Sequence, residues 1–239
     1  MTQNTSSAVM QQRREPADSL DDFPTPPWAT RALCEKLRDA GEPIEAQSVW
    51  EPACNRGYMA KPLEEYAGDV FATDVHSYGW SGQQDVADFT LQTARPLFTP
   101  DWVITNPPFR LAEAFIQTGM QIARRGVAVF VRTSFVEGVG RYQTLFRHVN
   151  EALFMPFAER VVLWNGVLLD PDVPITRWNA KRKEFVTEKP TSATSYCWLV
   201  FDKAHRGRGY VDRIPPCRKQ LTRPGDYPLL PVELRSRAV

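Results

Sequence analysis

The chain has 239 residues, of which 43% are hydrophobic and 24% charged, and its formal net charge is +1. This size and composition are typical of one soluble α/β domain with at most a small appendage. The near-neutral charge excludes a uniformly basic surface, so a nucleic-acid-binding surface would have to be local. The four cysteines are scattered, and this spacing excludes a disulfide framework or a zinc finger.

No apolar run approaches the roughly 18 residues needed to cross a bilayer. The N-terminus does not combine a charged start with an apolar stretch, as a signal peptide does. We therefore expect a cytoplasmic protein without a membrane partner. Residues 1–20 are polar and aperiodic, which predicts a disordered N-terminal lead.

Beyond an extended Pro-rich segment at 23–27, predicted strands and helices alternate along the chain. Parallel strands are expected at 48–50, 69–73, 102–105 and 126–132. Helices are expected at 28–40, 57–66, 111–124 and 140–149. Two closing strands, favoured as an antiparallel pair, are expected at 160–164 and 196–201, and Trp198 is expected in the core. This alternation predicts a mostly parallel sheet with helices on both faces, and ligands at the carboxyl ends of its strands.

The strongest chemical signal lies at 101–109 (DWVITNPPF), an apolar strand that ends in Asn-Pro-Pro-Phe. The chain here resembles the amino-methyltransferases, whose signature is Asp/Asn-Pro-Pro-Tyr/Phe after a strand. A base amino group is a poor nucleophile, and acceptors placed at its N–H bonds stabilise the positive charge that develops during methyl transfer. Asn106 offers its side-chain oxygen and Pro107 its carbonyl. Pro108 completes the motif, and Phe109 offers a face on which an extruded base can stack.

The resemblance implies a Rossmann-like class I methyltransferase fold: a mostly parallel seven-stranded sheet, helices on both faces and an antiparallel terminal strand pair. It implies S-adenosyl-L-methionine as the cofactor, S-adenosyl-L-homocysteine as its product, and no metal. The order of the motifs matches the subclass in which target recognition follows the catalytic motif. The short chain is similar to the orphan adenine methyltransferases of phages and prophages, which implies that DNA is the partner and adenine N6 the acceptor.

The segment 49–60 (VWEPACNRGYMA) resembles the cofactor loop of this family, Glu/Asp-Pro-Ala-x-Gly-x-Gly. Asn55 stands where the first glycine is expected, and asparagine is the non-glycine residue that best tolerates a left-handed backbone. Asp74 ends the next predicted strand, where an acid binds ribose hydroxyls in nucleotide-binding α/β folds.

Two more segments match the family. Asp88-Phe89 resembles the pair whose acid contacts the cofactor's adenine, with Asp85 as the alternative acid. Thr25-Pro26 resembles a Thr-Pro segment that touches the cofactor. The resemblance thus implies a cofactor site made of Thr25, Pro26, Glu51, Pro52, Ala53, Asn55, Gly57, Asp74, Val75, Asp88, Phe89 and Asn106.

Basic side chains mark the expected contacts with DNA phosphates. Residues 165–195 lack clear periodicity and form a candidate recognition insertion in a catalytic domain at 21–205, ahead of a basic Pro/Arg-rich tail at 206–239. The expected contacts are Arg132, Arg177, Lys181, Arg182 and Lys183. An ordinary solvated loop is the alternative at each place.

Two other functions stay open at this stage. The same motif serves adenine in RNA and the glutamine amide of proteins, although Phe109 and the compact chain favour DNA. A protein of another class, a catalytically inactive nucleic-acid-binding protein with this fold, is supported by Asn55 alone. The oligomeric state, monomer or homodimer, is open as well.

Overall fold

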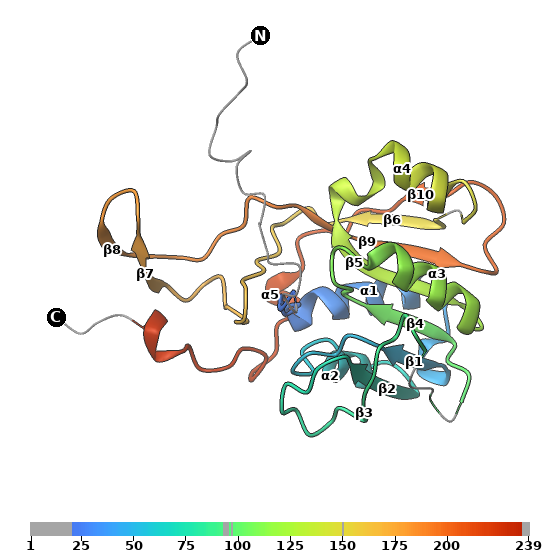
Figure 1. Ribbon diagram of the computed structural model, residues 1–239, viewed down its shortest axis with the longest axis horizontal. Coiled ribbons are helices and arrows are strands. Elements are labelled where there is room, and N and C mark those ends of the chain that lie inside the picture. Colours follow the sequence, from blue (N-terminus) through green and yellow to red (C-terminus); the bar gives the residue numbers. More distant parts are fainter. Residues whose placement is uncertain (1–20, 93–95, 97, 150, 236–239) are drawn as a thin grey trace, which may run out of the picture.

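The computed structural model describes residues 21–92, 96, 98–149 and 151–235, so the predicted lead at 1–20 lies outside the described residues. Its framework is an eight-stranded sheet of order β10-β6-β9-β5-β4-β1-β2-β3 (Figure 1). Neighbouring strands pair in parallel except at β9, which runs antiparallel to both β5 and β6. The strands of this sheet are β1 (Ser48–Glu51), β2 (Asp69–Asp74), β3 (Asp85–Val86), β4 (Trp102–Thr105), β5 (Gly126–Arg132), β6 (Leu153–Pro156), β9 (Tyr196–Asp202) and β10 (Tyr210–Val211).

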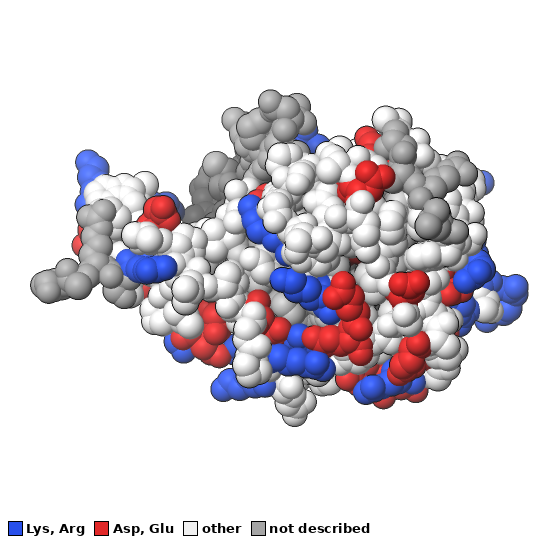
Figure 2. Space-filling view, turned by 90° about the horizontal axis from the view of Figure 1, so that it is seen from below, with Lys and Arg blue, Asp and Glu red and all other residues white. Residues whose placement is uncertain are grey.

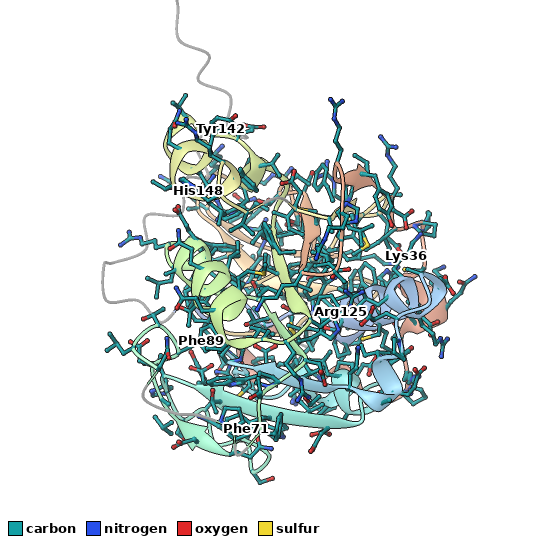
Figure 3. The ribbon with its side chains drawn as sticks, turned by 90° about the vertical axis from the view of Figure 1, so that its right-hand side faces the viewer. Lys36, Phe71, Phe89, Arg125, Tyr142 and His148 are labelled. Atoms are coloured by element: carbon teal, nitrogen blue, oxygen red, sulfur yellow. The ribbon has the colours of Figure 1, made fainter. Side chains whose placement is uncertain are left out.

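Helices cover both faces of the sheet, with α1 and α3 on opposite sides (Figure 3). The α-helices are α1 (Pro27–Asp39), α2 (Ala60–Glu64), α3 (Ala112–Ile122), α4 (Val139–Arg141) and α5 (Arg218–Leu221). Shorter helical segments are η1 (Ile44–Ala46), η2 (Thr133–Val136), η3 (Tyr142–Phe146) and η4 (Val232–Leu234). Helix α1 begins at Pro27, where a proline fits because the first helical N–H has no partner within the helix.

Strand β5 explains why a continuous apolar run is needed at the centre of the sheet. Ala128 and Phe130 pack into the core on the α1 side, whereas Val127 and Val129 pack into the core on the α3 side. All four are fully buried. Successive side chains of a strand point to opposite faces, so a strand covered on both sides cannot alternate with polar residues.

The mostly parallel sheet with an antiparallel closing strand is confirmed, with eight strands in place of the expected seven. The expected strand at 160–164 is wrong, because β6 at Leu153–Pro156 pairs with β9 instead. Val161 and Leu163 are buried, but they pack into the core from an irregular segment. Consecutive buried apolar residues therefore mimicked a strand there. Trp198 lies in the core as expected, with its Nε1 donating to the carbonyl of Ala29 at 2.9 Å.

Helix boundaries differ most after β5. The helix expected at 140–149 is the short α4 continued by η3, a π-helical turn. The helix expected at 57–66 is shortened to Ala60–Glu64 because the preceding residues form the turns of a loop.

Residues 165–195, expected to be aperiodic, contain a β-hairpin. Strands β7 (Ile175–Asn179) and β8 (Glu184–Glu188) pair antiparallel and form a separate two-stranded sheet. This hairpin extends away from the main sheet (Figure 1).

The face of the molecule in Figure 2 carries acidic and basic side chains side by side, in keeping with the balanced charge of the chain.

Part of the segment expected as a tail at 206–239 packs onto the domain. Its strand β10 pairs with β6. Arg31 of α1, only 3% exposed, forms ion pairs of 2.7 Å with Glu65 and Asp226. Within the described parts of the chain, no helix is long and apolar enough to span a membrane.

Candidate active site

A pocket lies where the loops after β1, β2 and β4 meet, beside the N-terminal segment that precedes α1. The strand order reverses between β1 and β4, and ligands of open parallel sheets bind outside the carboxyl ends of strands at such a point. Of the residues predicted for cofactor and catalysis, the pocket is lined by Thr25, Glu51, Ala53, Asn55, Asp74, Val75, Asn106 and Pro108. Segments from distant parts of the sequence thus meet as expected.

Glu51, the last residue of β1, is fully buried at the base of this pocket. Its Oε1 accepts hydrogen bonds from the Ala53 amide at 3.1 Å and the Thr105 hydroxyl at 2.7 Å. Its Oε2 is buried without a partner among the described residues. Burial outweighs the two hydrogen bonds and raises the pKa of Glu51 to about 8, with a further contribution from the charge of Asp74. The carboxyl is therefore mostly protonated at neutral pH, with one oxygen left for a polar ligand.

Asp74 ends β2 on the neighbouring side of the pocket. Its Oδ2 accepts from the Asn55 amide at 2.9 Å, and its Oδ1 accepts from the His76 amide at 3.1 Å. Burial raises the pKa of Asp74 in spite of these bonds. Because each carboxylate oxygen can accept more than one hydrogen bond, Asp74 retains capacity for two neighbouring hydroxyl groups.

The cofactor-like loop keeps a glycine-like backbone without the first glycine. Asn55 has a φ of 52°, in the left-handed region that asparagine tolerates. Its side-chain amide donates to Asp22 at 2.7 Å. Gly57 has a φ of +78°, and a Cβ added there would lie 2.4 Å from the Trp80 ring. The loop therefore accommodates an asparagine at position 55, where the family motif has glycine, but it would not accommodate a side chain at position 57.

Residues 21–23, which we call the N-terminal strap, bridge the two loops of the site. The Phe23 carbonyl accepts from the side-chain amide of Asn106 at 3.0 Å. Asp21 accepts from the Phe109 amide at 2.6 Å, and Asp22 accepts from Arg56 at 3.0 Å. The strap therefore holds the cofactor-like loop and the Asn-Pro-Pro-Phe loop in one arrangement.

Thr25 follows the strap and contributes a second unused polar group. It is 3% exposed, and its hydroxyl has no hydrogen-bond partner among the residues that the structure describes. Buried polar groups are normally paired, so an unpaired hydroxyl and the unpaired Glu51 oxygen in one pocket point to a polar ligand that completes them.

The Asn-Pro-Pro-Phe loop directly follows β4. The hydrogen bond to Phe23 uses the amide nitrogen of Asn106, which leaves the amide oxygen as an acceptor for a substrate. Pro107 is buried and Pro108 half-buried. The Phe109 ring lies 5.9 Å from that of Phe23, and the guanidinium carbon of Arg132 lies 4.4 Å from its centroid.

Some predicted site residues lie elsewhere. Asp88 and Phe89 do not line the pocket. The side chain of Asp88 accepts from the hydroxyl and amide of Thr90, and these bonds lower its pKa. Phe89 is 2% exposed and packs on Trp50 and Phe115, both at ring distances of 5.0 Å, in the α3-side core (Figure 3). Asp85, the alternative to Asp88, is exposed on β3. Three further predicted residues are neighbours in sequence of residues that line the pocket but do not line it themselves: Pro26, Pro52 and Gly57.

The basic residues predicted to bind DNA fall in two places. Arg132 lies beside Phe109, whereas the other four lie on the hairpin. Arg177 is paired with Glu188 across the two strands. At the turn, Asn179 accepts from the amides of Lys181 and Arg182, so three exposed basic side chains, those of residues 181–183, cluster at the tip.

Comparison with known proteins identifies the fold. Neither a family model nor a curated protein matches the sequence. Among solved structures, the methyltransferase subunit of a type I restriction-modification system from Streptococcus thermophilus matches with a TM-score of 0.55 and 10% identity, over 80% of this chain and 48% of that chain. A proposed class I S-adenosylmethionine-dependent methyltransferase from Listeria monocytogenes matches with a TM-score of 0.52 and 13% identity, over 86% and 69%. The fold is that of the class I methyltransferases.

Several residues of this class I methyltransferase fold were missed from the sequence. Asp21, Tyr58, Met59 and Tyr78 line the pocket, and Asp22 anchors Asn55. A signal existed for the two acids, because only two residues separate them from the Thr-Pro segment. The tyrosines gave none, since an isolated tyrosine in a loop has no pattern.

Within the described chain, no group of three or more His, Cys, Asp or Glu is arranged to hold a metal ion.

Proposed function

We propose that the protein transfers a methyl group from S-adenosyl-L-methionine to N6 of adenine in DNA, with the target base flipped out of the duplex. The observation that carries this proposal is the position of Asn106. It lines the same pocket as Glu51 and Asp74, and its amide nitrogen is bonded while its oxygen is left as an acceptor. An amide oxygen in that place is suited to a substrate amino group.

The pocket residues fit the cofactor. Asp74 has the capacity to accept hydrogen bonds from the two ribose hydroxyls. Thr25 and Glu51 offer buried oxygens without partners for other polar groups of the ligand. The left-handed Asn55 weakens the argument for an inactive binding protein, which rested on this residue. When bound, S-adenosyl-L-methionine supplies an electrophilic methyl group.

The chain's own residues would act on the substrate amino group. Asn106 and the Pro107 carbonyl would accept its two hydrogen bonds and stabilise the positive charge that grows on the nitrogen. Phe109 would stack on the extruded base, whose removal from the duplex costs stacking energy. The proton released from the amino group can leave to water, so no strong general base is required.

One observation favours a nucleic acid over a protein glutamine, and a second favours DNA. The hairpin carries a cluster of exposed basic residues at 181–183, suited to phosphates. A structural neighbour with the same fold is the methyltransferase subunit of a restriction-modification system. Phe109 and the compact chain also favour DNA, and the short chain resembles the orphan enzymes of phages and prophages. Adenine in RNA and the glutamine amide of a protein are the competing acceptors in the experiment below.

The test is to incubate the protein with methyl-labelled S-adenosyl-L-methionine and plasmid DNA, total RNA or bulk protein, and to identify the labelled product. N6-methyladenine in DNA is the expected product. Replacing the catalytic amide, Asn106→Ala, should lower the single-turnover rate at least about a hundredfold, as removal of one preorganised polar partner does. The rate should fall more than the cofactor affinity, because the interaction with the amino group strengthens in the transition state, whereas the lost hydrogen bond to Phe23 affects the bound and reacting states alike.

Gln143→Ala is the matched control, since it removes an exposed carboxamide from η3. This variant should methylate at the wild-type rate. If Asn106→Ala also methylates at the wild-type rate, the proposed chemistry is wrong. If the label enters only RNA or protein, the chemistry stands and the proposed acceptor is replaced.

A further inference from the structure

Arg132 occupies a position that the target base would need. It is the last residue of β5, and β5 pairs with β4, whose end carries the Asn-Pro-Pro-Phe loop. Its guanidinium carbon lies 4.4 Å from the centroid of the Phe109 ring. A guanidinium is planar and stacks on aromatic faces much as a base does. Phe23 packs against the same ring, so Phe109 is partly covered already.

The guanidinium of Arg132 lacks the polar partners that a half-buried arginine normally has. Among the described residues it has no ion pair and no hydrogen bond, and its Nε is buried without an acceptor. Arg141 provides the contrast. It lies 4.2 Å from the Phe135 ring, yet it also donates to the carbonyls of Phe135 and Glu137. A buried donor without a partner is destabilising, so Arg132 is held by the ring alone and is poised to accept an anion.

We propose that Arg132 occupies the stacking site of the target base in the free protein and leaves it when its guanidinium pairs with a phosphate of the extruded nucleotide. The inference rests on the proposed function, because it takes the stacked ligand to be a base that enters from a nucleic acid. A cation–π contact is weak, whereas an arginine–phosphate pair is charge-assisted and can be bidentate. The exchange is therefore favourable for a nucleotide that brings both base and phosphate.

This arrangement would select bases that carry a phosphate over free nucleosides. A free nucleoside has to displace the guanidinium from Phe109 without offering it a phosphate in return. A nucleotide within a strand displaces it and satisfies it in the same step. Arg132 would thus favour DNA over the free nucleosides of the cell without reading any base edge.

The test uses two small probes, 2′-deoxyadenosine and 2′-deoxyadenosine 3′,5′-bisphosphate, titrated by NMR in the presence of S-adenosyl-L-homocysteine. The wild-type protein should bind the bisphosphate at least about tenfold more tightly, as expected for a charge-assisted pair. Arg132→Ala should move the two affinities in opposite directions. The nucleoside should bind about threefold more tightly because its competitor on the ring is gone, and the bisphosphate about tenfold more weakly because its charged partner is gone.

Arg110→Ala is the matched control, because it removes an exposed arginine directly after Phe109. It should leave the nucleoside affinity within about twofold of the wild-type value, since the cation–π pair on the Phe109 ring stays intact. Arg132→Lys keeps the charge and should retain part of the preference for the bisphosphate. The spectrum of Arg132→Lys also identifies the Nε–H resonance of Arg132, because this resonance is missing from it. In the free wild-type protein, stacking on the Phe109 ring should move the chemical shift of this resonance away from its ordinary position.

If Arg132→Ala weakens both probes equally, or if the Nε–H resonance keeps its displaced position with the bisphosphate bound, the inference is overturned while the adenine substrate stands. Thymidine and its 3′,5′-bisphosphate separate the two proposals. If they bind as well as the adenine probes and show the same opposite shifts, the role of Arg132 is supported and the proposed adenine specificity is the part that fails.

Discussion

Replacing the buried carboxyl at the end of β1 by an amide, Glu51→Gln, should change how stability depends on pH. Burial raises the pKa of Glu51 from its ordinary value of 4.5 to about 8 in the folded protein. The folded state therefore keeps a proton that the unfolded chain loses between these pH values. The stabilisation that this proton contributes is fully present below pH 4.5, and it is lost as the pH rises through the folded-state pKa of about 8. At about 1.4 kcal/mol per pH unit, the free energy of unfolding should fall by on the order of 3–5 kcal/mol over this interval.

Glutamine reproduces the protonated carboxyl without its titration. Its carbonyl oxygen can accept from the Ala53 amide and the Thr105 hydroxyl, as Oε1 of Glu51 does. The variant should be no more stable than the wild type at pH 5, because its amide N–H groups gain no acceptor. It should be the more stable protein at pH 9, where the wild-type carboxyl is ionised in a buried place.

The measurement is urea denaturation of both proteins without cofactor at pH 5 to 9, followed by tryptophan fluorescence. Asp74 also has a raised pKa and is present in both proteins, so the difference between them contains the titration of Glu51 together with its interaction with Asp74. A wild-type minus variant difference that stays constant from pH 5 to 9 would show that Glu51 is ionised in the folded protein. The argument from burial would then be refuted.

Two further predictions concern the ligands. Asp74→Ala should weaken binding of S-adenosyl-L-methionine by about 1.5–3 kcal/mol if the hydrogen bonds to ribose are charge-assisted. Calorimetry measures this, with Asp69→Ala at the exposed start of β2 as the control, and an unchanged affinity for Asp74→Ala excludes it from the site. Replacing all of 181–183 by alanine should weaken binding of every DNA sequence alike and flatten the log–log salt dependence by about 0.9 for each phosphate that is no longer neutralised. An unaltered slope identifies the hairpin tip as a solvated turn.

The central elements of the fold and the pocket were predictable because their signals are local and strong. A buried parallel strand has to be apolar throughout, so β5 could be assigned from its sequence, and Asn106 and Asp74 follow apolar strands at positions where ligands bind. Left-handed Asn55 could be anticipated from the conformational tolerance of asparagine.

The other features depend on contacts that a sequence pattern does not contain. Buried residues 161–163 resemble a strand, but only pairing with β9 distinguishes a strand from a buried irregular segment, and β6 makes that pairing. Phe89 matches a family motif, but its ring completes a core cluster instead of lining the pocket. The contact of Arg132 with Phe109 joins the end of β5 to the loop after β4, which only the sheet brings together.

The hairpin of β7 and β8 has a consequence for how this protein could diversify. Within the part of the chain that the structure describes, neither strand pairs with the eight-stranded sheet. Residues between Ile175 and Glu188 can therefore change in length and composition without breaking a backbone hydrogen bond of the framework. If the hairpin binds the target as proposed, related chains can differ in their hairpins while sharing one pocket, and target preference can change separately from the reaction chemistry.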